Sequence, residues 1–417
     1  MGHKNSAAVK SITDNPSNIF TMKKKHTIRS FSLLSTLIFA LSASVNAQNL
    51  TDRKTCLSRA QFMYSQIWKH YRVNRYRGLF LEYFPKDTTG KVDYVEGSAV
   101  KVKEVSFLWP FSGMVSATNA LLHNPSARRE YLPYLDSLVI GMEAYKDTSR
   151  KPPGYQAYPP AMEKSDRYYD DNGLVGIEYA EAYLNTKKPQ YLDRAKLAFN
   201  FIISGWTDEL GGGVYWLEGH HDQKPACSNG MALLVALKLY EATSDKTYLD
   251  WGERFYNWMQ TNLKAPNGLF YNDKKTKDGS INATFYTYNT GSVIEAGALL
   301  YRFTKQEKYL HDAQDAAKAS YDYYHGQQHD PNLEMKIDLP WFVTVLFRGY
   351  ESLYRIDKNS KYINAIHHDL DYAWKNGRDA NGFISHDWTA KKVEIAKHKW
   401  LMDEDCIAEL YARLSRM

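Results

Sequence analysis

The sequence predicts an all-α protein, built as an (α/α)6 barrel of six inner and six outer helices with short β-hairpin-like loops at the active-site rim. Two observations support this. From residue 52 onward, helical segments with one charged face alternate with helical segments that are apolar nearly all round. A tyrosine followed by Leu or Ile recurs near the start of the charged segments, at positions 131, 191, 248, 309 and 362, so successive tags are 60, 57, 61 and 53 residues apart. This spacing is typical of a two-helix repeat.

The apolar segments are expected to form the inner ring, because a helix that is apolar on every side must be enclosed by other elements. These segments are 112–122, 174–184, 230–240, 291–301, 341–350 and 405–414. The charged-face helices then lie outside them. An open solenoid of helix pairs is the alternative, but it requires polar-faced capping repeats, which the sequence does not show.

Short glycine-containing connections form a second repeat. Each follows an outer helix and precedes an inner one, and their pattern is typical of short hairpin-like strands. They are 77–80, 212–216, 267–271 and 381–384. Because the inner helices begin at the same end of the barrel, we expect these connections to gather at one rim.

Residues 1–47 are interpreted as a leader. The basic stretch 23–29 precedes an apolar run at 31–45, and Val45-Asn46-Ala47 supplies small residues where a signal peptidase cuts. We therefore expect a signal peptide over 22–47, cleavage near Ala47, and a periplasmic or secreted product. The apolar run contains four serines and is shorter than the roughly twenty residues of a membrane span, so no stable span is expected in the mature chain.

The remaining residues, 48–417, have ordinary globular composition and are expected to form a single catalytic domain. Basic and acidic residues are nearly balanced in this part, which gives no electrostatic footprint for nucleic acid. Three cysteines, Cys56, Cys227 and Cys406, are too few for a disulfide framework. Cys56 and Cys406 lie in the first and last predicted helices, which are neighbours in a closed ring, so a bridge between them is a structural prediction to test.

The sequence Tyr-Tyr-Asp-Asp-Asn-Gly at 168–173 places two adjacent carboxylates, Asp170 and Asp171, where an inner helix begins. An N-cap role explains one Asp. Two carboxylates a few ångströms apart disfavour each other's ionised form, so one stays protonated as an acid while the other is anionic. A glycosidase uses this pairing, although sequence adjacency does not decide between retaining and inverting geometry.

Aromatic and amide side chains at the same rim are candidate sugar contacts. Most of the aromatic residues are expected to pack between helices, while a subset at the rim would stack on sugar faces. The aromatic candidates are Trp109, Tyr169, Trp216, Tyr288, Trp341 and Trp388, and we expect about half of them to touch ligand. The amide candidates, Asn172, Asn229 and Asn289, would either cap helices or bind sugar hydroxyls.

The sequence offers little support for other chemistries. His220-His221-Asp222 and His367-His368-Asp369 lack the spacing and third ligand of a zinc site. There is no G-x-S-x-G motif, no P-loop and no dinucleotide-binding fingerprint in a strand–helix setting, and Gly211-Gly212-Gly213 is interpreted as a turn in a helical repeat.

Five motifs together resemble glycoside hydrolase family 76. They are Tyr-Tyr-Asp-Asp-Asn-Gly at 168–173, Gly-Gly-Gly-Val-Tyr-Trp at 211–216, Ser-Asn-Gly at 228–230, Thr-Tyr-Leu-Asp-Trp at 247–251 and Thr-Tyr-Asn-Thr-Gly at 287–291. They occur in the family's order over residues 100–325. Two departures, Leu174-Val175 after the Asp pair and Thr290 in the last motif, leave the carboxylates intact and fall where sugar subsites are expected.

The resemblance implies an (α/α)6 barrel and endo-acting hydrolysis of α-1,6-linked mannan with retention of configuration. It implies that Asp170 attacks the anomeric carbon while Asp171 protonates the leaving oxygen and then deprotonates the incoming water. It implies an α-mannan or mannooligosaccharide substrate and no metal or organic cofactor.

Three alternatives stay open at this point. In a transglycosylase, a sugar hydroxyl replaces water in the second step. An unsaturated uronide hydrolase on the same barrel needs basic residues for the substrate carboxylate, and His220, His221, Lys224 and Arg348 are candidates. A non-catalytic mannan-binding protein would use the aromatics and amides alone, but binding does not require an acid beside a nucleophile.

Overall fold

The computed structural model describes residues 52–87, 91–92, 100–101, 103–384, 386–391 and 397–417. The predicted signal peptide lies outside these residues. The chain divides into residues 1–54 and a compact unit, Thr55–Met417, which contains the barrel. None of its described helices is both long and apolar enough to cross a membrane.

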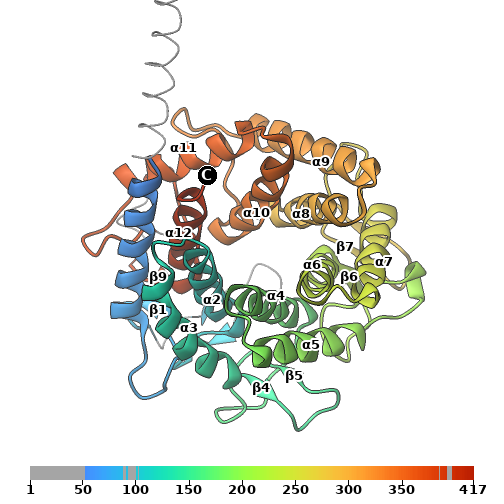
Figure 1. The fold of residues 1–417 in the computed structure, drawn as a ribbon, viewed down its shortest axis with the longest axis horizontal. Coiled ribbons are helices and arrows are strands. Elements are labelled where there is room, and N and C mark those ends of the chain that lie inside the picture. The colour runs from blue at the N-terminus through green and yellow to red at the C-terminus, as the bar shows by residue number, and fades with distance from the viewer. Residues whose placement is uncertain (1–51, 88–90, 93–99, 102, 385, 392–396) are drawn as a thin grey trace, which may run out of the picture. The chain divides into compact units, whose positions relative to one another are not determined.

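Six helices form a closed inner ring (Figure 1). They are α2 (Leu108–Leu122), α4 (Tyr169–Thr186), α6 (Ala226–Thr243), α8 (Thr287–Thr304), α10 (Pro340–Asp357) and α12 (Leu401–Leu414). Each packs on the next, and α12 packs back on α2. The ring therefore closes as the sequence predicts, and the open solenoid is excluded.

The second layer lies outside this ring and alternates with it along the chain. It consists of the helix at 52–71, α3 (Arg128–Glu143), α5 (Pro189–Ile203), α7 (Lys246–Asn262), α9 (Glu307–Gly326) and α11 (Lys361–Asn376). The recurring tag tyrosines Tyr131, Tyr191 and Tyr309 are buried, because each fixes an outer helix against the ring. The predicted (α/α)6 barrel is confirmed.

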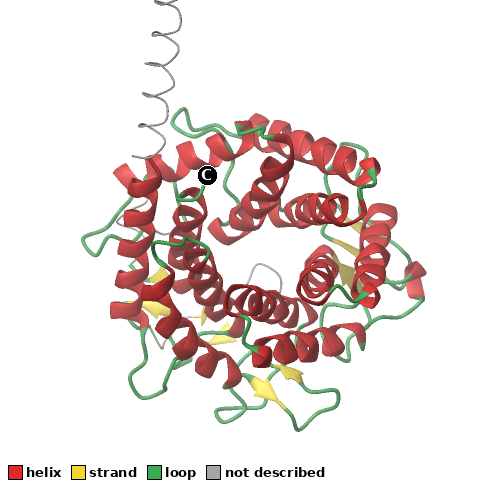
Figure 2. Ribbon diagram, viewed as in Figure 1, coloured by secondary structure: helices red, strands yellow, loops and turns green. Residues whose placement is uncertain are grey.

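Short strands occur in the connections between the helices (Figure 2). The pairs are β1 (Tyr83–Phe84) with β9 (Lys399–Trp400), β2 (Lys91–Val92) with β3 (Val100–Lys101), and β4 (Lys146–Asp147) with β5 (Gly154–Tyr155). A three-stranded sheet joins β6 (Gln223–Pro225), β7 (Asp273–Lys275) and β8 (Ile281–Asn282). All pairs are antiparallel.

Three of the four predicted hairpin-like connections close through a single antiparallel bridge: Arg72 with Phe80, Trp206 with Val214, and Lys264 with Phe270. The fourth closes through a backbone hydrogen bond from Asp379 to Phe383. Each connection leads from an outer helix to the start of an inner one, so the loops surround the N-terminal ends of the inner helices.

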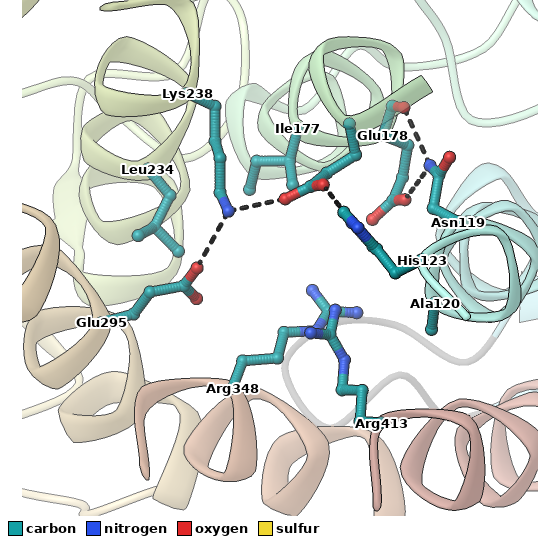
Figure 3. Close-up of a pocket in the computed structure, with 11 residues that line it drawn as sticks. Asn119, Ala120, His123, Ile177, Glu178, Leu234, Lys238, Glu295, Arg348 and Arg413 are labelled. Carbon is teal, nitrogen blue, oxygen red and sulfur yellow. Dashed lines mark hydrogen bonds and ion pairs between the residues drawn. The ribbon is translucent and has the colours of Figure 1, made fainter. Parts of the chain in front are cut away.

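The inner helices differ from their predicted apolar character on one side. Glu178, Glu295, Arg348 and Glu409 are all at most 5% exposed, yet they lie in the middle of these helices. The sides that face neighbouring helices are apolar, whereas the side that faces the barrel interior meets polar groups from the other inner helices (Figure 3). A charged residue is tolerated there because its partner comes from a neighbouring inner helix, as in the pairs Glu295–Lys238 and Arg348–Glu409.

The predicted disulfide is wrong. Cys56 and Cys406 are free thiols. The Cys56 Sγ atom on the outer helix lies 3.7 Å from His367 Nε2 of α11, while Cys406 on α12 contacts Asp405 and Thr344. The two helices belong to the same part of the ring, but the two side chains have different partners.

Candidate active site

Asp170 and Asp171 lie in the first turn of α4. The helix begins at Tyr169, and its N-cap is Tyr168, which is extended and makes no capping hydrogen bond through its side chain. The N-cap interpretation of the Asp pair is therefore wrong. Both carboxylates still benefit from the helix start, because unpaired backbone N–H groups favour negative charge there.

Asp170 is surrounded by hydrogen-bond donors. Its Oδ1 accepts from the backbone N–H of Asp171 at 3.1 Å, and the carboxylate also accepts from the Cys227 thiol and the Trp216 indole. Burial raises the pKa of Asp170, and these hydrogen bonds oppose that rise because they stabilise the anion.

Asp171 lies in a different environment. It is 6% exposed, and within the described part of the chain its Oδ2 atom has no hydrogen-bond partner. Burial, followed by the charge of Asp170, raises the pKa of Asp171 well above its ordinary range. The two adjacent carboxyls therefore hold protons unequally, because the pKa of Asp171 is raised further than that of Asp170.

The loop that carries Trp216 is fixed to the start of α4. Tyr168 forms an antiparallel bridge with Leu217, and the backbone N–H of Tyr169 donates to the Trp216 carbonyl at 2.9 Å. The Trp216 ring lies 5.2 Å from the ring of Tyr168. Backbone pairing thus holds Trp216 beside Asp170, although the two residues lie 46 positions apart in the sequence.

Two of the three candidate amides are structural, which corrects their predicted role. Asn172 accepts from the backbone N–H of Tyr155 at 2.7 Å and donates to the Tyr155 and Tyr168 carbonyls. Asn229 makes the same set of contacts with Val214 and Pro225. Both are fully buried, so their amides are occupied by the backbone and do not face a ligand.

The same position recurs around the ring. The fourth residue of α8, Thr290, accepts from the backbone N–H of Phe270 at 3.2 Å, and the fourth residue of α12, Glu404, accepts from Ile384 at 3.1 Å. Asn289 is also fully buried and reaches the Phe270 carbonyl only at 3.5 Å. A polar side chain in the first turn of each of these four helices therefore holds the preceding rim loop.

Two predicted aromatic contacts are also corrected. Tyr169 is 5% exposed, stacks on Phe201 of α5 and covers the bare Cα of Gly205. It therefore points toward the outer layer, because the residue before Asp170 lies on another face of the helix. Trp388 is 1% exposed and belongs to the core.

The other rim aromatics form a continuous cluster at the starts of α2, α8, α10 and α12. Trp109 meets Trp341 at 5.4 Å between ring centroids and Trp400 at 5.6 Å. Phe342 extends the cluster to Tyr288 at 4.3 Å. Trp109 and Trp400 are partly exposed, whereas Tyr288 and Trp341 are 6% and 5% exposed.

The uronide hydrolase alternative loses two of its candidate cations. Lys224 is fully buried and its ammonium donates to the carbonyls of Thr207, Glu209 and Gly212. Burial lowers the pKa of Lys224 to about 8. Arg348 is paired with Glu409 inside the barrel. Both cations are therefore occupied by structural partners. Among the described residues, no cluster of three or more His, Cys, Asp or Glu side chains is arranged to hold a metal ion.

A separate polar pocket lies deeper in the barrel (Figure 3). Glu178 lies seven residues after Asp171 on α4, which is about 10 Å along a helix axis. The pocket is lined by residues of all six inner helices or their ends: Asn119, Ala120, His123, Ile177, Glu178, Glu181, Leu234, Lys238, Glu295, Arg348 and Arg413.

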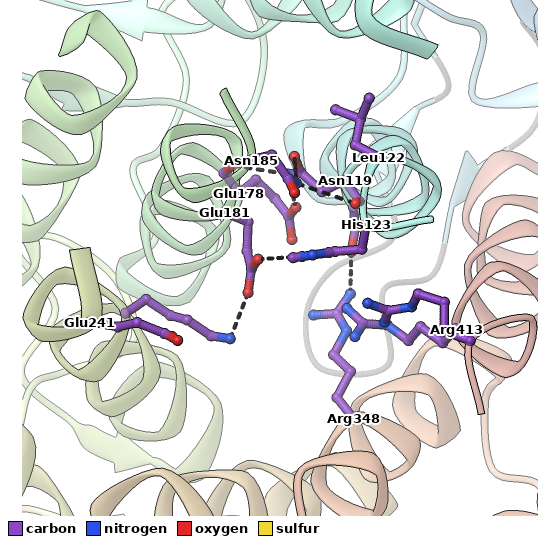
Figure 4. Close-up of polar contacts among 12 residues, drawn as sticks. Asn119, Leu122, His123, Glu178, Glu181, Asn185, Glu241, Arg348 and Arg413 are labelled. Atoms are coloured by element: carbon purple, nitrogen blue, oxygen red, sulfur yellow. Dashed lines mark hydrogen bonds and ion pairs between the residues drawn. The ribbon is translucent and has the colours of Figure 1, made fainter. Parts of the chain in front are cut away.

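Charged groups around this pocket form two connected sets, and Figure 4 shows the pair of Glu181 with His123 in the first of them. Glu181 pairs with His123 at 2.9 Å and Lys238 at 2.6 Å. Burial pushes the pKa of Glu181 up, but Lys238 and His123 outweigh it and hold the pKa well below its ordinary range. Arg348 and Arg413 both donate to Glu409, each at 2.7 Å. These pairs thus connect neighbouring inner helices around the pocket.

Glu178 is the least compensated acid of the pocket. It accepts one hydrogen bond from Asn119 Nδ2 at 2.9 Å. Burial raises the pKa of Glu178 to about 7, because the nearby Arg348 is already shared with Glu409.

Comparison with known sequences identifies the family. The family model described as Glycosyl hydrolase family 76 matches residues 55–324, which is more than half of the chain. The chain belongs to glycosyl hydrolase family 76. The matched region contains the Asp pair, Trp216 and the first four inner helices.

Curated relatives of this family 76 chain share shorter stretches with it. It is 29% identical over 184 residues to mannan endo-1,6-alpha-mannosidase DCW1 of Saccharomyces cerevisiae, covering 40% of this chain and 41% of that one. It is 32% identical over 173 residues to the protein of the same name from Eremothecium gossypii, covering 36% and 38%. The match therefore spans about two fifths of the length of these relatives.

Solved structures match over more of the family 76 barrel. A GH76 alpha-mannanase of Bacteroides thetaiotaomicron is 25% identical, with a TM-score of 0.76, and the match covers 86% of this chain and 95% of that one. A family 76 mannosidase of the same species is 27% identical, with a TM-score of 0.76, covering 87% and 98%. An inactive double-aspartate variant of a Salegentibacter alpha-1,6-mannanase, solved with alpha-1,6-mannotetrose, shares the fold at 22% identity, with a TM-score of 0.69, covering 86% and 98%.

Sequence reasoning missed several residues of this family 76 chain. The sequence gives Cys227 no role beyond its place in the cysteine count, although it lies in the first turn of α6 beside Asp170. Glu178, Lys238 and Glu295 were hidden within helices described as apolar. The sequence did contain a signal for the polar pocket: a charged residue in the middle of an otherwise apolar helix requires a partner when it is buried.

Proposed function

We propose that this chain is a retaining, endo-acting hydrolase of α-1,6-linked mannan, with Asp170 as nucleophile and Asp171 as acid and base. The observation that supports these roles is the unequal environment of the two carboxyls. Asp170 receives hydrogen bonds that favour its anion, as a nucleophile requires, while Asp171 lacks such donors and retains its proton.

In the first step, Asp170 attacks the anomeric carbon and Asp171 gives its proton to the leaving oxygen, which breaks the glycosidic bond. In the second step, Asp171 takes a proton from water and the water oxygen displaces Asp170, which regenerates the enzyme with the original anomeric configuration. The curated relatives, which are named mannan endo-1,6-alpha-mannosidases, and the mannotetrose complex of the Salegentibacter enzyme support α-1,6-mannan as substrate.

The rim aromatics support binding of a sugar chain. Trp109 and Trp216 are partly exposed, and they lie on α2 and on the loop that precedes α6, on either side of α4. These two rings are proposed to stack on mannose rings, whereas the more buried Tyr288 and Trp341 are proposed to line the same rim.

Separate replacement of the two carboxyls tests the mechanism. Asp170→Asn is expected to abolish cleavage of both α-1,6-mannan and an aryl α-mannoside with an acidic leaving group. Asp171→Asn is expected to lose mannan cleavage but still to release the aryl group in a burst, because that leaving group needs no proton. Asp222→Asn, in an exposed loop, is the matched control. Wild-type mannan cleavage by both active-site variants would overturn the proposal.

Product analysis distinguishes the finer alternatives. Proton NMR of the first products is expected to show the α-anomer, whereas an initial β-anomer would mean inversion. Added mannooligosaccharide acceptors are expected to leave hydrolysis as the main outcome, and longer products in place of free reducing ends would indicate transglycosylation. Export remains a prediction, and N-terminal sequencing of the mature protein from culture fractions checks cleavage near Ala47.

A further inference from the structure

The carboxylate of Asp170 receives hydrogen bonds from side chains of two other segments. The Trp216 indole comes from the rim loop, and the Cys227 thiol comes from the first turn of α6. Trp216 is held in place by the bridge between Tyr168 and Leu217. The position of Cys227 has a separate cause.

Helices α4 and α6 are neighbours in the inner ring, and they touch one turn below Asp170 and Cys227. A Cβ atom added to Gly173 would lie 2.5 Å from the Cβ of Met231. Gly173 follows Asp170 by three residues, and Met231 follows Cys227 by four, so each pair lies on one helix face. The close approach at Gly173 therefore brings Asp170 and Cys227 together at the rim.

Cys227 differs from the other cysteines in access. It is partly exposed, whereas Cys56 and Cys406 are 2% and 1% exposed. The Cys227 Sγ atom lies 3.9 Å from the Ser228 hydroxyl, at the outer limit for a sulfur hydrogen bond. Its thiol also donates a hydrogen bond to the Asp170 carboxylate.

We propose that Cys227 is a positioning residue for Asp170: its thiol, together with the Trp216 indole, fixes the orientation of the carboxylate and supplies a hydrogen bond to its anion. This inference rests on the proposed function, because it assigns Cys227 a part in preparing the nucleophile. The thiol does not react. It donates to an oxygen of Asp170, while the other donors to that carboxylate come from Trp216 and the backbone of the first turn of α4.

Three variants separate positioning from packing. Cys227→Ala removes the donor, Cys227→Ser keeps a donor of nearly the same size, and Cys56→Ala is the control for loss of a thiol far from the site. For Cys227→Ala we expect kcat/KM on α-1,6-mannan to fall about tenfold, with KM little changed, because a hydrogen bond to a charged group is lost. The acidic limb of the pH profile should shift to higher pH, and Cys227→Ser should restore both values toward wild type.

A merely structural role predicts another pattern. Cys227→Ala would then lower the unfolding midpoint without moving the acidic limb, and Cys227→Ser would not restore kcat/KM. That outcome, or a Cys227→Ala variant with an unchanged pH profile, would overturn the inference. Cys56→Ala is expected to leave the pH profile unchanged.

A second measurement is independent of catalysis. Carboxyl carbon-13 NMR of aspartate-labelled protein, with the Asp170 signal assigned by its loss in Asp170→Asn, gives the pKa of Asp170 directly. We expect that pKa to rise in Cys227→Ala and to return in Cys227→Ser. If wild-type protein cleaves no α-1,6-mannan, the proposed function fails, while this titration still decides the contact. An unchanged Asp170 pKa in Cys227→Ala would then refute the hydrogen bond from the Cys227 thiol to Asp170.

Discussion

Gly173 of α4 lies directly against Met231 of α6: a methyl group at Gly173 would come within 2.5 Å of the Met231 Cβ atom. The same kind of approach recurs at Gly291 of α8, where an added Cβ would lie 2.5 Å from the backbone of Leu346 in α10. A glycine in the second turn of an inner helix thus lets the neighbouring helix come close. At Gly173 the approach also aligns the candidate nucleophile with its donors.

Replacing Gly173 with Ala is expected to separate α4 from α6. Overpacking of this kind costs about 1 to 3 kcal/mol in the free energy of unfolding, and kcat/KM should fall because Asp170 moves away from Cys227. Urea unfolding and mannan assays measure the two effects. Gly326→Ala at the exposed end of α9, where an added Cβ meets no atom within 4 Å, should change neither. A Gly173→Ala variant as stable and active as Gly326→Ala would contradict the packing argument.

The pH dependence of cleavage should reflect both carboxyls. Burial raises the pKa of Asp170, and burial with the charge of Asp170 raises that of Asp171 much further. Activity should therefore fall as the pH drops through the pKa of Asp170, because the nucleophile is protonated, and fall again as the pH rises through that of Asp171, because the acid is lost. A profile of kcat/KM against pH is expected to be bell-shaped, with both limbs above the ordinary carboxyl range. A flat profile up to strongly alkaline pH would count against Asp171 as the acid.

Asn172 is expected to contribute more to stability than Asn289. Asn172→Ala leaves the buried N–H and C=O of Tyr155 without partners, which costs about 3 kcal/mol in the free energy of unfolding. Asn289→Ala removes only a contact of 3.5 Å and should cost about 1 kcal/mol beyond packing. Chemical denaturation compares the two variants. Equal losses would show that holding the rim loop is not the main role of Asn172.

Glu178 should make the barrel less stable as the pH rises. Its folded-state pKa is about 7, against an ordinary value of 4.5, so between these values the folded state binds more protons than the unfolded state. Stability is therefore lost over that interval, by about 3 kcal/mol in total. Glu178→Gln removes the titrating group and should flatten this part of the stability profile, as measured by urea unfolding at pH 4 to 8.

Glu181 provides the matched comparison for Glu178. Its pKa is held well below the ordinary range, so its contribution is present at neutral pH and lost as the pH falls. Glu181→Gln should therefore destabilise the protein most at neutral pH. For Glu178, parallel profiles of stability against pH in Glu178→Gln and wild type would contradict its raised pKa.

Glu409 should be far more sensitive to substitution than a surface acid. Glu409→Gln removes the charge that Arg348 and Arg413 share, and breaking a buried pair in this way costs about 3 to 5 kcal/mol. Glu241→Gln breaks the more exposed pair with Arg302 and should cost less than about 1 kcal/mol. Thermal and urea unfolding test both. Similar losses for the two variants would mean that the buried network adds nothing beyond a surface contact.

Some of the active-site assignment followed from sequence and some did not. The adjacency of Asp170 and Asp171 is a property of the chain, and so is their position at the start of an inner helix. The hydrogen bonds that make the two carboxyls unequal come from Trp216 and Cys227, which lie 46 and 57 residues away. No local pattern shows that these two side chains reach the same carboxylate.

For two of the amides, the sequence suggested a ligand contact that the structure does not support. Asn172 and Asn229 occur in motifs that suggest ligand contacts, yet both bind the backbone of the preceding rim loop. Sequence places an amide at the rim, but the direction of the side chain depends on which backbone segment packs against that helix face. The same reason explains why Tyr169 and Trp388 are buried.

The sequence alone determined the closed ring of alternating helices, because hydrophobic periodicity and repeat length are properties of the chain that do not depend on tertiary contacts. It also determined where the paired acids enter that ring. Tertiary structure decided which neighbours each acid received, which rim residues were committed to the backbone, and why Arg348 has an ion-pair partner while Glu178 has none among the described residues. These outcomes depend on contacts between distant segments, whose partners are set only when the helices pack.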